Sequence, residues 1–218
     1  GVEGVECGLI FAGLGVKVTF LGRWEPLLRK LDADIAERAT ELLGERVVLR
    51  LNQQLTGMEP ADDGGVVITT SDAYGVEYSY ETDAVLVAIG RIPNGDQLRL
   101  DAVGITLDHA GFVPVDEHLR SAVPHIWASG DICAPAMLNH LANQQARVVK
   151  RNLLAERDGG ELVTSDERFV PQGVFGEPEI ASVGRTEQEL VDAQIDHVSY
   201  TQEYKWVAYG WALNDQDH

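Results

Sequence analysis

The first part of the chain alternates between helix-like and strand-like patterns of hydrophobic residues. Apolar and small residues dominate positions 5–15, which predicts a short buried helix that ends at a glycine. Residues 32–43 repeat apolar side chains three or four positions apart and predict an amphipathic helix. Strands are predicted where apolar residues alternate or run together, at 16–21, 47–51, 55–59, 65–70, 76–80 and 84–89.

The order of these elements indicates an α/β fold with a parallel sheet. Helices and strands alternate at first, which is typical of a Rossmann-like, dinucleotide-binding domain. The next three strands are separated by glycine-containing turns at 62–65 and 73–75, and they predict a β-meander. Segment 84–89 is apolar throughout, as in a strand covered on both faces. Such a sheet needs a central strand ahead of the first helix, so we expect the sequence to be a fragment of a longer chain.

After segment 84–89 the pattern predicts loops with fewer regular elements. Helices are expected at 138–155 and 186–193, and the second opens with Thr186 and Glu189 in capping-box spacing. Glycines at 159 and 160 indicate a linker between them. Strands are predicted at 113–120, 125–129, 170–174, 180–183 and 198–211.

Composition narrows the classes of function. The 218 residues include 17 basic and 35 acidic side chains, for a net charge of -18, and such a surface repels nucleic-acid phosphates. No apolar run approaches the ~20 residues that cross a bilayer. Cys7 and Cys133 show neither zinc-ligand nor disulfide-framework spacing, and no metal site is expected. We expect a cytoplasmic protein without nucleic-acid or membrane partners.

Two groups of residues in the first part suit a dinucleotide. Gly1, Gly4 and Gly8 recur at the start of the first helix, where backbone amides can approach a pyrophosphate. Tight packing of a helix through small residues would produce the same spacing. Arg23 and Arg29 follow the first predicted strand, where NAD-binding folds usually place an acidic residue.

This arginine pair predicts a clamp for the 2′-phosphate of NADPH. A carboxylate at this point would repel that phosphate, whereas Arg23 and Arg29 can bind it through charge-assisted, bidentate hydrogen bonds. The alternative is that these arginines are solvated at the surface and pair with Glu25 or Asp32.

Two glycine motifs come next and carry a family resemblance. AIGRIPN at 88–94 and ASGDI at 128–132 each follow an apolar run, where glycine lets the backbone approach a ligand. Each motif alone is compatible with a simple turn. Together they resemble the ATGRxPN and second flavin-binding motifs of the pyridine nucleotide–disulfide oxidoreductases, and the motif order matches that family across essentially the whole sequence.

Within that family, three segments resemble members that reduce mycothiol disulfide with NADPH, namely 137–154, 169–184 and 207–213. The resemblance implies FAD and NADPH as cofactors, a small-molecule disulfide as substrate and a homodimer as the full-length enzyme. It also implies three regions: an NADP-binding domain at 1–92 without its first strand, an FAD-associated central segment at 93–160, and the truncated start of an α+β interface domain at 161–218.

The resemblance assigns cofactor-binding roles residue by residue. Glu6 matches a helix glutamate that pairs with a lysine near the flavin. Asp131 matches the aspartate bonded to the ribityl or phosphate region of the flavin, and Met137 and Leu138 match the helix N-terminus at its pyrimidine edge, where the helix dipole favours the reduced ring. The complete predicted set is Gly1, Gly4, Glu6, Arg23, Arg29, Gly90, Gly130, Asp131, Met137 and Leu138.

Departures from the family pattern concern the reacting groups. Val2 replaces an aromatic residue that gates the nicotinamide in many members, and Glu3 replaces an apolar one. The redox-active CxxxxC pair and the His–Glu dyad have no counterpart, so no catalytic residue is predicted and we expect the isolated polypeptide to be inactive. Alternatives are a dihydrolipoamide dehydrogenase or mercuric reductase relative, a non-catalytic dinucleotide-binding or dimerisation module, and a simple NAD(P)-dependent dehydrogenase.

Overall fold

A computed structural model describes residues 1–134 and 136–213 and divides them into two compact units. The first unit spans Gly1–Gly184 and the second begins at Arg185. The three predicted regions, 1–92, 93–160 and 161–218, remain a prediction. None of the helices within the described residues combines the length and the apolar character that a bilayer-spanning helix needs.

The predicted alternation of helices and strands at the start of the chain is confirmed. Helix α1 (Val2–Gly13) leads to β1 (Thr19–Leu21), and α2 (Ala33–Gly44) leads to β2 (Val48–Arg50), which pairs with β1 in parallel. Helix α2 is amphipathic because its apolar and small residues recur every three or four positions and turn inward. The core beneath it contains Val5, Leu28, Ala39, Leu43 and Val174.

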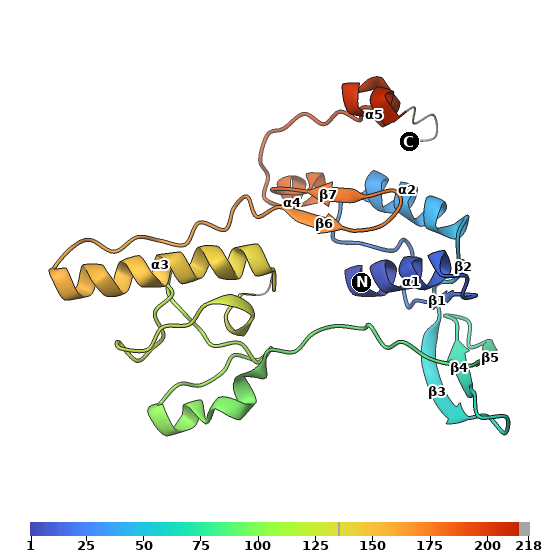
Figure 1. Ribbon diagram of the computed structural model, residues 1–218, viewed down its shortest axis with the longest axis horizontal. Helices are drawn as coiled ribbons and strands as arrows, with labels where there is room; N and C mark the ends of the chain where they lie inside the picture. Colours follow the sequence, from blue (N-terminus) through green and yellow to red (C-terminus); the bar gives the residue numbers. More distant parts are fainter. Residues whose placement is uncertain (135, 214–218) are drawn as a thin grey trace. The chain divides into compact units, whose positions relative to one another are not determined.

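The β-meander is also confirmed. Strands β3 (Gln54–Pro60), β4 (Val66–Ser71) and β5 (Glu77–Thr82) form an antiparallel sheet in that order, drawn in cyan and green in Figure 1. Gly64 and Gly75 adopt positive φ angles of 91° and 80° in the two connecting turns. Glycine tolerates this left-handed backbone, which explains why the turns occur at these positions.

The prediction of a strand at 84–89 is wrong for this structure. The segment is extended but has no ladder partner among the described residues. Three of its apolar side chains are largely exposed, with 56% for Leu86, 62% for Val87 and 94% for Ile89. A strand is defined by hydrogen bonds to a neighbour, and an apolar run alone does not supply them.

The central part of the chain is built on one long helix. Helix α3 (Asn139–Asp158) buries Leu141, Gln145, Val148 and Asn152, which lie on one face at spacings of four and three. The predicted strands before it are wrong, because the described residues there contain only isolated bridges, Val115 with Ser121 and Arg120 with Trp127. The 3₁₀ turns of this region lie outside both predicted strands, and η3 (Gly130–Ile132) follows the second of them.

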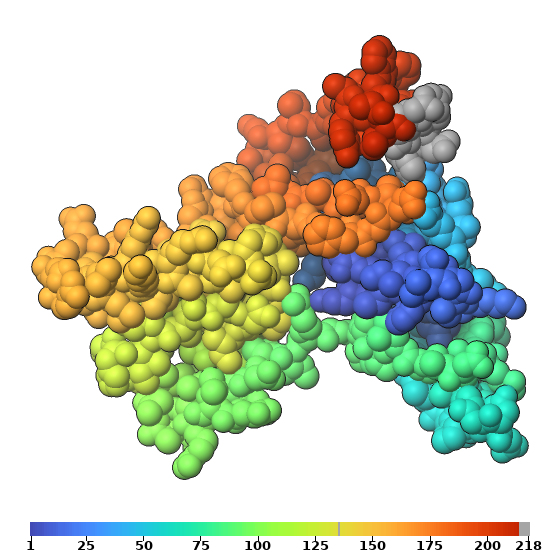
Figure 2. Space-filling model, viewed as in Figure 1, coloured from blue at the N-terminus to red at the C-terminus, as the bar shows by residue number. Residues whose placement is uncertain are grey.

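A short hairpin closes the first unit. The two strands predicted here are confirmed as β6 (Gln172–Val174) and β7 (Ile180–Ser182). They pair antiparallel, and β6 packs against α1. Figure 2 shows the orange hairpin lying against the blue start of the chain. Val174 thereby joins the core that also contains Val5.

The second unit contains two short helices. Helix α4 (Glu187–Asp192) opens with the predicted capping box, since Thr186 and Glu189 each bond the other's backbone amide. The strand predicted at 198–211 is wrong: residues Tyr204–Trp206 form a 3₁₀ turn and Ala208–Leu213 form helix α5. Glycine and alanine between the aromatic residues allow a helical turn that the apolar composition alone did not indicate.

Candidate functional site

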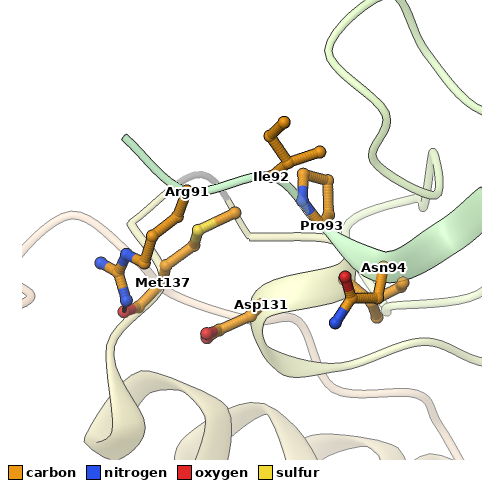
Figure 3. Close-up of a pocket in the computed structure, with 7 residues that line it drawn as sticks. Arg91, Ile92, Pro93, Asn94, Asp131 and Met137 are labelled. Atoms are coloured by element: carbon orange, nitrogen blue, oxygen red, sulfur yellow. Dashed lines mark hydrogen bonds between the residues drawn. The ribbon is translucent and has the colours of Figure 1, made fainter. Parts of the chain in front are cut away.

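An open cavity of about 430 Å³ lies where the two glycine motifs meet. Arg91, Pro93 and Asn94 line it from the AIGRIPN segment, and Asp131 and Met137 line it from the segment before α3 (Figure 3). Segments some 40 positions apart in sequence therefore share one surface. This is where the flavin-binding residues were predicted.

Gly90 stands at the start of this surface in a backbone conformation that favours glycine. Its φ is 151°, and a Cβ atom at this position would have no heavy atom within 4 Å. The requirement for glycine at Gly90 therefore comes from the backbone conformation and not from crowding in this structure. The bare backbone leaves room for a ligand to approach closely.

Arg91 connects three parts of the first unit. Its Nη1 donates to the Met137 carbonyl oxygen at 2.9 Å, and its Nε lies 3.0 Å from Glu3 Oε1 on α1. Both side chains of the ion pair are about half exposed, so its main effect is positional and its energetic contribution is small. Glu3, which departs from the family pattern, thus has a defined partner.

The second glycine motif is held by a buried amide side chain. Gly130 has a φ of 78°, and a Cβ atom there would lie 3.1 Å from Ala142 Cβ on α3. Its N–H donates to Gln145 Oε1 at 2.6 Å, and Gln145 Nε2 donates to Glu167 Oε1 at 2.6 Å. The turn is therefore locked to α3, and Asp131 projects from it as an exposed carboxylate beside the cavity.

Cys133 lies in the same turn and is poorly suited to be a nucleophile. Its Sγ is 3.5 Å from the Gly130 carbonyl oxygen and 3.9 Å from Gln145 Oε1. Burial, and then the negative charge of Glu167, raise the pKa of the Cys133 thiol to about 11. At neutral pH this thiol is protonated, which matches a structural role.

The loop between β1 and α2 carries both arginines for which a phosphate clamp was predicted. Arg23 and Arg29 are both exposed on it, and the Arg29 guanidinium lies 5.1 Å from the centre of the Trp24 ring. Glu25, one of the two alternative partners considered for the arginines, accepts a hydrogen bond from Asn52 Nδ2 at 2.8 Å. Glu25 is therefore engaged with a neutral side chain.

Backbone contacts anchor this loop at several points. Gly22 N–H donates to the Arg50 carbonyl at 3.0 Å, and the Gly22 carbonyl accepts from Gln53 N–H at 2.9 Å. A Cβ atom on Gly22 would lie 2.8 Å from Leu51 Cδ2, so the Leu51 side chain would have to move to admit a larger residue. Further along, Leu27 N–H donates to Thr40 Oγ1 on α2 at 2.9 Å.

The N-terminus of α1 carries the glycine-rich turn. Gly1 is its N-cap, and no side-chain cap is formed among the described residues. A Cβ atom on Gly4 would lie 3.5 Å from Ala88 Cβ, an ordinary contact distance. Glu6 Oε1 accepts a hydrogen bond from Phe175 N–H at 2.9 Å, next to β6.

The structure thus brings most of the predicted residues into two groups, whereas Glu6 belongs to neither and accepts a hydrogen bond from Phe175 N–H. Asp131 and Met137 line the cavity, and Gly90, Gly130 and Leu138 are next to lining residues in the sequence. The Glu3–Arg91 pair links this group to the turn at Gly1 and Gly4. Arg23 and Arg29 stand on the loop after β1. Residues missed by the sequence analysis are Trp24, Arg91, Asn94 and Gln145; the quoted AIGRIPN motif contained two of these, whereas nothing in the sequence distinguished Gln145 from other helix positions.

Comparison with known proteins identifies the family. A sequence model described as "Pyridine nucleotide-disulphide oxidoreductase" matches residues 1–146. The chain belongs to this family. The predicted resemblance is therefore confirmed, and the chain is homologous to flavoprotein disulfide reductases, which use FAD and NAD(P)H.

Named relatives of two kinds match almost the whole chain. Mycothione reductase of Mycobacterium tuberculosis (strain ATCC 25618 / H37Rv) is 36% identical over 216 residues, covering 99% of this chain and 46% of the relative. Dihydrolipoyl dehydrogenase of Vibrio parahaemolyticus is 32% identical over 213 residues, covering 98% and 43%. The chain spans about half the length of these relatives.

Solved structures agree with this placement. The Cu(II) complex of the HOCl-induced flavoprotein disulfide reductase RclA from Escherichia coli has a TM-score of 0.83 at 29% identity, covering 99% of this chain and 47% of that one. LpdA from Mycobacterium tuberculosis has a TM-score of 0.83 at 27% identity, covering 98% and 45%. The α/β architecture of this chain is thus that of half a flavoprotein disulfide reductase.

Proposed function

We propose that this chain is part of an FAD-dependent disulfide reductase that takes electrons from NADPH and reduces a low-molecular-weight thiol disulfide of the mycothione type. In this proposal residues 1–92 bind NADPH, residues 93–160 belong to the flavin-binding region, and the part from 161 on begins the interface of a homodimer. The full-length enzyme acts in the cytoplasm.

The observation that carries the coenzyme assignment is the loop after β1. It presents Arg23 and Arg29 at the surface, and backbone hydrogen bonds from Gly22 and Leu27 hold it in place. Two guanidinium groups on an anchored loop favour a dianionic phosphate because each can form charge-assisted, bidentate hydrogen bonds. NADPH carries this extra phosphate and NADH does not.

The described residues fit both cofactors. The backbone amides at the start of α1 suit a pyrophosphate, and Asp131 beside the cavity suits a hydroxyl-bearing ribityl chain. Gly90 leaves the backbone accessible, and α3 begins after Leu138 without a side-chain cap, so its positive end is available to a developing negative charge. When bound, FAD supplies the transfer of electrons between the nicotinamide and a thiol pair.

The chain itself supplies binding and orientation. Its two cysteines are free, stand 126 positions apart in sequence, and Cys133 is protonated at neutral pH. We therefore expect residues 1–218 alone to show no NADPH-dependent reduction of mycothiol disulfide. Turnover by the purified polypeptide, measured as NADPH oxidation, would contradict this assignment.

Coenzyme preference tests the central part of the proposal. We expect Arg23→Ala in the complete protein to weaken NADPH binding by about 12- to 150-fold, because a charged hydrogen bond is worth about 1.5–3 kcal/mol, and to leave NADH binding nearly unchanged. Lys30→Ala, which removes another exposed cation of the same loop, is the matched control. A loss of tenfold or less for NADPH would reject the clamp.

A dihydrolipoyl dehydrogenase activity is the second candidate, because such enzymes are 32% identical over nearly the whole chain. It predicts the opposite coenzyme result: tighter binding of NAD(H) than of NADP(H), and little effect of Arg23→Ala on either. Reduction of lipoamide and of mycothiol disulfide by the complete protein, compared side by side, separates the two substrates.

A further inference from the structure

We propose that Trp24 is the platform on which the adenine ring of the coenzyme stacks, so that the loop after β1 recognises the base as well as the 2′-phosphate. This inference rests on the proposed function, because it concerns the same site. According to this inference, the indole contributes to the free energy of coenzyme binding through the adenine ring, whereas the arginines contribute through the phosphate.

Trp24 is exposed at the surface of an anchored loop. Its exposed fraction is 58%, and it stands between Arg23 and Glu25, whose carboxylate is held by Asn52 at 2.8 Å. Large aromatic side chains gain most when buried, so an indole held at the surface offers stacking area to a flat ligand.

Contacts on both sides of Trp24 hold the backbone of the loop in place. Gly22 on one side is bonded to the backbone of β2 and of Gln53. Leu28 on the other side is 8% exposed and belongs to the core of the first unit. The backbone on both sides of Trp24 is therefore already ordered. Binding of a flat group to the exposed indole should lose little conformational entropy of the loop.

The Arg29 guanidinium defines which chemistry suits the ring. Its Cζ lies over the indole ring, 5.1 Å from the ring centre, and places a positive charge against one π face, so a purine would stack on the opposite face. A purine stacks on an indole through its own π face, and the phosphate next to it pairs with guanidinium groups. Adenosine 2′-phosphate combines these two groups within one nucleoside, so Trp24, Arg23 and Arg29 together match this part of NADPH.

Stacking and charge are expected to act on different parts of the ligand. Base stacking on an aromatic residue is worth about 1–3 kcal/mol, so Trp24→Ala should weaken binding by about 5- to 150-fold. The loss should affect adenosine 2′,5′-bisphosphate and AMP alike, since both carry adenine. Arg23→Ala should affect only the first of these.

Tryptophan fluorescence of the complete protein tests the stacking directly. Titration with adenosine 2′,5′-bisphosphate is expected to quench the emission, and Trp24→Phe should remove this quenching while binding, measured by calorimetry, stays within a few-fold. Trp206→Phe is the matched control, because Trp206 is also highly exposed, at 67%, but lies in the second unit. Circular dichroism confirms that each variant is folded.

The outcomes separate this inference from the proposed function. Unchanged affinity of Trp24→Ala for both nucleotides, or full quenching in Trp24→Phe, would overturn the adenine platform, while a selective effect of Arg23→Ala would still support NADPH. Loss of both nucleotides in Trp24→Ala without any preference for the 2′-phosphate in the wild type would support the platform and reject NADPH. Binding of neither nucleotide by the wild type would reject both.

Discussion

Replacing Gln145 by methionine tests whether the turn at Gly130 depends on a single buried side chain. Gln145 is 1% exposed, accepts the Gly130 N–H and donates to Glu167, each at 2.6 Å. Methionine has a similar length and no hydrogen-bonding amide, so the substitution removes both hydrogen bonds with little change in volume. The helix that carries this residue should remain intact, because both residues are good helix formers.

The expected cost follows from the burial of the two partners. Gly130 is buried, and its amide would lose its acceptor, which costs about 1–3 kcal/mol. Glu167 is exposed and can be hydrated instead, so the lost bond on that side should cost about 1 kcal/mol. We therefore expect Gln145→Met to lower the free energy of unfolding by about 2–4 kcal/mol.

Urea-induced unfolding, followed by circular dichroism, measures this change. Gln144→Met is the matched control: its Nε2 donates to the Asp166 carbonyl oxygen at 2.9 Å, and because the side chain is only partly buried we expect a loss below about 1 kcal/mol. If the two variants prove equally mild, the buried hydrogen bonds do not hold the turn and the reasoning fails.

A second variant at the same position should make the free energy of unfolding depend on pH. Gln145→Glu keeps an acceptor for Gly130 but sets a carboxylate against Glu167. Mutual repulsion should raise the pKa of this pair above its unfolded value. The stability of the variant relative to wild type is then greatest at acidic pH and falls as the pH rises through the raised pKa.

Two further predictions concern packing and thiol chemistry. Gly8→Ala should destabilise the protein by about 1–3 kcal/mol in thermal unfolding, because a Cβ atom there would lie 2.3 Å from Phe20 Cζ. Gly13→Ala in the same helix is the control: its Cβ atom would meet no atom within 4 Å, so the variant should be neutral or stabilising. Cys133, with its pKa raised to about 11, should react with iodoacetamide at about pH 8 far more slowly in the folded than in the urea-unfolded protein; equal rates would contradict its burial. The same shift predicts that stability falls as the pH rises from about 9 to about 11.

The sequence alone determined the helices and strands in which buried side chains recur at a regular spacing. Helices α2 and α3 and the strands of the β-meander were predicted within a few residues, because each repeats apolar side chains at its own period and ends at glycine-containing turns. The capping box at Thr186 was predictable for the same reason: both of its hydrogen bonds join residues three positions apart.

Only the tertiary structure decided the features that depend on partners far away in the chain. Segment 84–89 is apolar yet forms no strand, because a strand requires hydrogen bonds from a neighbour that the local pattern does not encode. Gln145 lies 15 positions from Gly130 and 22 from Glu167, and Arg91 lies 46 from Met137, so no local period could pair them. The sequence determined which residue types stand at the candidate site, and folding decided which of them meet.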